Sequence, residues 1–60
     1  MSTVYNPEAD IIAEIEKLEI GARELRRRVE HVRNEEDKRV LNRQLKEVEQ
    51  RIEVLRHRIP

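Results

Sequence analysis

Apolar residues recur along this chain in alternating steps of four and three, the spacing of a coiled-coil seam. The first series occupies the N-terminal half and consists of Ile11, Ile15, Leu18, Ala22, Leu25, Val29 and Val32. The second series follows in the C-terminal half and consists of Leu41, Leu45, Val48, Ile52, Leu55 and Ile59. Steps of this kind place side chains on one face of an α-helix. The pattern predicts two amphipathic helices and an all-α fold.

The spacing between the two series predicts that the helices fold back on each other. Val32 and Leu41 are nine residues apart, so at about 100° per residue the second series starts about half a turn away from the first. One straight helix would carry its two apolar stripes on opposite sides, whereas a turn lets them face each other. We expect a flexible lead over residues 1–6 and a single hairpin domain over 7–60, with a helix over 7–33, a turn over 34–37 and a helix over 38–59.

Local signals mark the ends of these helices. Asn6-Pro7 is a strong helix start, because Asn accepts from free N–H groups as N-cap and Pro needs no donor at the first position. The acidic run from Glu35 to Asp37 suits the positive end of the second helix, with Asn34 or Asp37 as its N-cap. Gly21 lowers helix stability by about 1 kcal/mol relative to Ala. It marks either a close approach of another backbone or a tolerated surface position.

The charged residues beside the seams favour antiparallel packing. Folding about the turn brings three fully charged pairs together, all opposite in sign: Glu14 with Arg58, Glu19 with Arg56, and Arg26 with Glu49. A parallel homodimer would instead pair like charges, such as Glu14 with Glu19. The expected fold is therefore an antiparallel, coiled-coil-like two-helix hairpin. A swapped dimer of two chains would use the same charge pairs.

The length of the chain argues for self-association. A core built by 60 residues rarely contributes more than about 3–5 kcal/mol, and without Cys the chain forms no disulfide. Ile12, Ile20, Val40 and Val54 lie off the seams, and Ile11 with Ile12 is expected beyond the reach of the second helix. We expect a homo-oligomer, most simply a dimer that forms an antiparallel four-helix bundle, with a different protein as the alternative partner. The predicted interface residues are Ile11, Ile12, Ile20, Val40 and Val54.

Little in the composition points to catalysis. His31 and His57 face outward in the heptad frame, Ser2 is the only serine, and one glycine cannot form a phosphate-binding loop. We expect no enzyme, no metal site and no cofactor.

The net charge of zero gives no overall attraction to nucleic acid, and no apolar run is long enough to span a membrane. A cytoplasmic protein without membrane contact is the expectation.

Two functions remain open at this point. The first is a non-enzymatic interaction or oligomerisation module, such as a small adaptor, chaperone-like or regulatory protein, that acts by helix-on-helix packing. The alternative is a small RNA-binding hairpin dimer that contacts phosphates through a basic zone near the turn. The residues of this basic zone are Arg23, Arg27, Arg28, Lys38, Arg39 and Arg43.

Overall fold

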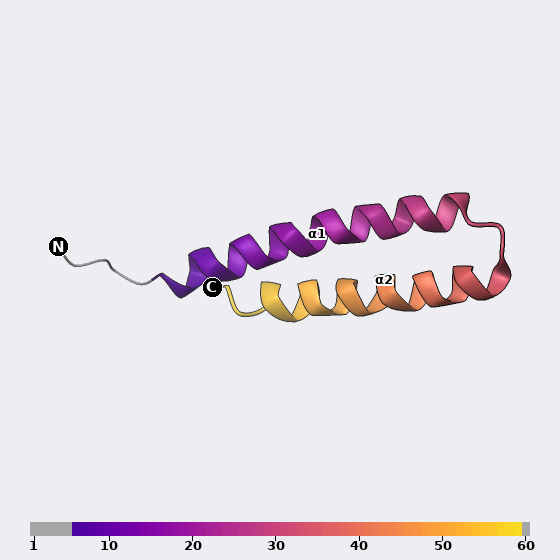
Figure 1. The fold of residues 1–60 in the computed structure, drawn as a ribbon. Coiled ribbons are helices and arrows are strands. Elements are labelled where there is room, and N and C mark those ends of the chain that lie inside the picture. The colour runs from indigo at the N-terminus through magenta and orange to yellow at the C-terminus, as the bar shows by residue number, and fades with distance from the viewer. Residues whose placement is uncertain (1–5, 60) are drawn as a thin grey trace.

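The computed structural model describes residues 6–59, and this part of the chain consists of two packed helices without any strand (Figure 1). Helix α1 spans Pro7–His31 and helix α2 spans Glu35–Arg56. The helices run antiparallel, so the end of α2 lies beside the beginning of α1 (Figure 1). The prediction of an all-α two-helix hairpin is confirmed, whereas most of the expected N-terminal lead lies outside the described residues.

Helix α1 begins at Pro7, directly after its cap. The Asn6 side chain accepts hydrogen bonds from the backbone N–H groups of Glu8 at 3.1 Å and Ala9 at 3.4 Å. These bonds satisfy donors that have no partner within the helix. The acidic side chains of Glu8 and Asp10 lie in the first turn, where the helix dipole favours negative charge.

The turn is shorter and earlier than the predicted turn over 34–37. Helix α1 ends at His31 rather than at residue 33, and Val32 adopts an extended conformation that redirects the chain. The Asn34 side chain accepts from the N–H groups of Glu36 at 2.8 Å and Asp37 at 3.3 Å. Helix α2 therefore starts at Glu35 instead of residue 38, because Asn34 is its N-cap and the acidic run fills its first turn.

The C-terminal end also differs from the predicted helix over 38–59. Regular helix stops at Arg56, and the N–H groups of Arg58 and Ile59 bond the carbonyls three residues back, at 3.1 and 3.3 Å. This tighter winding turns Ile59 onto the hydrophobic cluster, where it is partly buried. Ile59 directly precedes Pro60 in the sequence, and a proline disfavours helical backbone at the residue before it, so regular helix is not expected to include Ile59.

The two apolar series meet along the hairpin, but they are not equally buried. Ala22 and Leu55 are 1% exposed, and Ile15 and Ile52 are 7% exposed. All other seam residues keep intermediate exposure, including every seam residue near the turn. The cluster of Ile15, Ile52 and Leu55 therefore lies toward the open end of the hairpin. The part of the seam near the turn is only half covered.

The Asn34 cap gives a first prediction. Replacing Asn34 by Ala removes the acceptor that begins α2 and should lower the free energy of unfolding by about 1 kcal/mol. Thermal unfolding followed by circular dichroism measures the change. Asn42→Ala is the matched control, because Asn42 is exposed in the interior of α2, where Ala is the better helix former. Equal effects of the two substitutions would contradict this role of Asn34.

The buried cluster gives a second prediction. Leu55→Ala should destabilise the hairpin by about 2–5 kcal/mol, which is enough to unfold a domain of this size. Val54→Ala serves as the control, because Val54 is 47% exposed whereas Leu55 is 1% exposed. Helicity at 25 °C should be largely lost in the first variant and retained in the second. Retained helicity in the Leu55 variant would contradict the claim that burial of the seam residues stabilises the hairpin.

Candidate interaction surfaces

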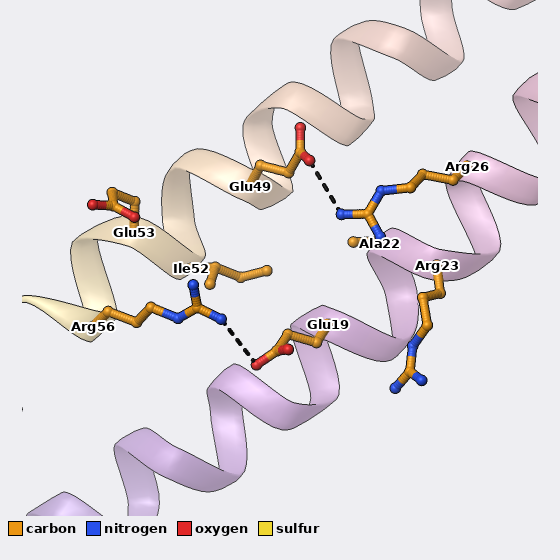
Figure 2. A pocket seen from close by; sticks show the side chains of 8 residues that line it. All are labelled: Glu19, Ala22, Arg23, Arg26, Glu49, Ile52, Glu53 and Arg56. Carbon is orange, nitrogen blue, oxygen red and sulfur yellow. Dashed lines mark hydrogen bonds and ion pairs between the residues drawn. The ribbon is translucent and has the colours of Figure 1, made fainter.

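Two ion pairs bridge the helices along one flank of the hairpin. Arg26 contacts Glu49 at 3.2 Å, and Arg56 contacts Glu19 at 3.5 Å (Figure 2). Both pairs are the ones that the antiparallel charge pattern predicts. All four side chains are about half exposed, so each pair contributes only about 0.2–1 kcal/mol. Their value lies in fixing the register of one helix against the other.

A shallow groove lies between these two ion pairs. Ala22 and Ile52 lie in it between the helices, and charged side chains surround them (Figure 2). The small Ala22 and the larger Ile52 come from facing positions, as the seam pattern predicts. The complete lining consists of Glu19, Ala22, Arg23, Arg26, Glu49, Ile52, Glu53 and Arg56. The charged side chains that bridge the helices here already pair with each other, so the groove belongs to the helix interface.

The third predicted ion pair is wrong. Glu14 contacts Arg51 at 3.8 Å instead of Arg58. The reason is the early end of α2, since Arg58 follows the last helical residue and no longer holds the expected heptad position. Within residues 6–59 no ion pair involves Arg58. The Glu14 carboxylate, near the open end of the hairpin, therefore pairs with Arg51, which lies seven residues before Arg58.

The expectation that Ile11 lies beyond the reach of the second helix is wrong. Ile11 is partly buried against the cluster of Ile15, Ile52 and Leu55. Ile59 turns back onto the same cluster and so extends the apolar contact past the end of α2. Ile12, the next residue of α1, remains 43% exposed.

The remaining predicted interface residues are exposed but do not share a face. Ile20 is 54%, Val40 51% and Val54 47% exposed. Ile20 follows Ile11 by nine residues and so lies about half a turn from the α1 seam, whereas Val54 lies about 130° from the middle of the α2 seam. Because the seams face each other, Ile20 and Val54 lie on opposite outer sides of the hairpin. One flat surface cannot cover both residues.

Val40 belongs to a different surface. Together with Val32, Leu41, Asp37 and Gln44 it lines a shallow hollow near the turn. Val32 and Leu41 are seam residues of intermediate exposure. The hollow therefore continues the half-covered part of the seam onto the surface. Sequence reasoning did not identify this opening, although a seam closed by only two helices necessarily has two open edges.

The six residues of the basic zone are also divided between opposite sides. Arg27 follows Leu18 by nine residues and Arg43 precedes Ile52 by nine, so both lie opposite the seams, on the two outer sides of the hairpin. Lys38 is of intermediate exposure, at the turn end of the α2 seam, whereas the other five are exposed. Arg23 points away from the helix interface (Figure 2). The zone is therefore not one continuous basic face.

The histidines and acidic residues form no larger cluster in the described part of the chain. His57 Nε2 lies 3.0 Å from Glu53 Oε1 within the exposed last turns of α2. His31 is exposed at the end of α1. Among residues 6–59, no three His, Asp or Glu side chains come close enough to hold a metal ion. Neither α1 nor α2 has the length and apolar character needed to cross a membrane.

The arrangement as a whole defines an antiparallel helical hairpin with ion-paired flanks and a half-covered apolar seam. No protein-family model, no curated protein and no solved structure matches this chain. Functional inference therefore depends on the surfaces of the hairpin itself.

The ion pair between Arg26 and Glu49 allows a test of the register. Arg26→Glu should destabilise the hairpin by a few tenths to about 1 kcal/mol, because it places two carboxylates together. Adding Glu49→Arg should restore most of that loss by reversing the pair. Chemical denaturation of the single and double variants measures the coupling. Additive effects in the double variant would mean that the two side chains do not meet.

Proposed function

We propose that this chain is a non-enzymatic oligomerisation and interaction module, acting in the cytoplasm, in which hairpins associate by helix-on-helix packing into a larger helical bundle. The observation that carries the proposal is the incomplete burial of its own seam. Among the described residues only Ile15, Ala22, Ile52 and Leu55 are buried, and the rest of the seam keeps intermediate exposure.

The energetic argument concerns the edges of the seam. In a pair of helices, each seam side chain is covered by the facing helix but stays open along both flanks. Removing apolar surface from water contributes roughly 25 cal/mol per Å². Four buried side chains among residues 6–59 are few for a stable domain, and Ile20, Val40 and Val54 remain about half exposed. Association that covers more of this surface stabilises the folded chain by mass action.

Binding of RNA is the less supported function. Phosphate contacts by this hairpin need basic side chains that reach one backbone together. Arg27 and Arg43 lie on opposite outer sides, while Glu24, Glu30 and the acidic residues of the first α2 turn are interspersed among the basic ones. These positions weaken the attraction of any single face for a polyanion.

Self-association makes stability depend on protein concentration. Across a hundredfold range of concentration, the molar mass from light scattering should rise from about that of one chain, 7.3 kDa, toward twice that value. The midpoint of thermal unfolding should also rise with protein concentration, because association stabilises folded chains and not unfolded ones. A constant monomer mass together with a constant midpoint would overturn the proposed function. RNA binding that falls steeply with salt would instead support the alternative.

A further inference from the structure

The outer side of α1 carries a second stripe of evenly spaced residues. It lies between the back of the helix, where Ile20 is 54% exposed, and the flank, where Gly21 borders the seam. Helix α2 packs on the seam side of α1 and leaves this outer stripe uncovered (Figure 1). The stripe consists of Asp10, Ala13, Glu14, Lys17, Ile20, Gly21, Glu24, Arg27, Arg28 and His31.

The charges of this stripe are reversed about its centre. Lys17 and Glu24 lie at equal distances on either side of the midpoint between Ile20 and Gly21. Farther out, Glu14 is balanced by Arg27 at the same distance from the midpoint, with Arg28 beside it. A second α1 helix laid antiparallel across this midpoint would therefore set Lys17 against Glu24 and Glu14 against Arg27, each twice by symmetry. A parallel copy would set each charge against itself.

The helix dipole does not explain this order. It favours acidic residues in the first turn and basic residues in the last, and its effect is confined to those turns. Lys17 and Glu24 lie in the middle of α1, with the basic residue on the N-terminal side. Glu14 already contacts Arg51 of α2 at 3.8 Å, whereas within residues 6–59 neither Lys17, Glu24 nor Arg28 takes part in an ion pair. These charges are therefore available to a partner.

The centre of the stripe has the shape that close helix packing requires. A Cβ added to Gly21 would meet nothing within 4 Å, so no close approach inside the hairpin accounts for this glycine. An antiparallel copy would place its Ile20 over this gap, and the reverse contact would follow by symmetry. Gly21 lies three residues after Leu18 and four before Leu25, so the same Ile20 would also reach the open edges of these two seam residues.

We propose that a second copy of this chain docks on this outer stripe, with its α1 antiparallel and a two-fold axis passing between Ile20 and Gly21. This inference rests on the proposed function and specifies its partner, face and register. One helix pair buries less surface than stable interfaces need, so the dimer is of the weak, reversible class unless the α2 helices also meet. The second copy extends apolar contact along the flank that the hairpin leaves open.

Two matched substitutions in α1 test the centre of the stripe. Ile20→Lys should place a charge in the gap at Gly21 and raise the dimer Kd by at least roughly tenfold. Ile12→Lys is the control, since Ile12 is the same residue type, is 43% exposed and lies on the opposite flank of the helix. It should leave the Kd within about twofold of the unchanged protein. Sedimentation equilibrium measures both, with circular dichroism confirming that helicity is retained.

A charge exchange tests the register. Lys17→Glu and Glu24→Lys should each weaken self-association roughly tenfold at low salt, because two attractive pairs become repulsive. Mixing the two variants should restore association, since every facing pair is then opposite in sign. Glu30→Lys is the matched control for charge, because Glu30 lies on the other flank and is exposed.

The outcomes separate this inference from the proposed function. If the unchanged protein is a monomer throughout the concentration range, self-association fails and the inference fails with it. If it dimerises but Ile20→Lys has no more effect than Ile12→Lys, or mixing the charge variants restores nothing, the inference alone is overturned. Loss of dimer in the Ile20 variant together with recovery in the mixture would establish both the face and the antiparallel register.

Discussion

The fold depends on burying two apolar seams that lie half a helical turn out of phase. A single straight helix would leave both seams in water, because they would lie on opposite sides of it. Reversing the chain at residues 32–34 brings the seams together, and the extended Val32 and the Asn34 cap make that reversal compatible with two complete helices. The hairpin is thus the smallest arrangement in which this chain covers its apolar residues with its own helices.

The same arrangement leaves the two flanks of the apolar seam partly exposed to water. Ala22 and Ile52 pack small against large, and the ion pairs of Arg26 and of Glu19 hold the helices in register without adding much stability. In the part of the chain that the structure describes, no third element lies over the flanks, and seam side chains near the turn stay partly exposed. Incomplete burial and the unpaired charges of α1 are two independent reasons to expect that the hairpin works in association with a copy of itself.

Much of the fold follows from the sequence because its signals are local and periodic. The steps of the seam predict the buried residues, and Asn6-Pro7 predicts the beginning of α1. The predicted end of α2 is too late, because the seam pattern continues to Ile59 whereas Pro60 disfavours helical backbone at that residue. The choice of Asn34 over Asp37 as N-cap was equally open, since both residue types cap helices. The predicted helix bounds correspond to Asp37 as the cap, so the predicted end of the first helix is two residues too late and the predicted start of the second is three residues too late.

The surfaces were harder to predict than the fold. The exposure of Ile20 and Val54 follows from their positions off the seam. Whether the two residues lie on the same side of the hairpin depends on the direction in which each helix points its seam. That direction is fixed only once the helices are packed. Ile11 shows the converse, because it packs against the cluster of Ile15, Ile52 and Leu55 although its position at the start of α1 led us to expect exposure.

Distance measurement between spin labels on the two helices tests the central claim, that each chain closes its own seam. The chain has no cysteine, so Glu16→Cys and Glu53→Cys provide unique labelling sites. Helices that pack 8–10 Å apart should bring the labels within about 30 Å of each other, and dilution with unlabelled protein should leave that distance unchanged. A continuous helix would separate the labels by about 55 Å. If short distances are present but none survives dilution, the helices pair between chains, and either result would contradict the hairpin.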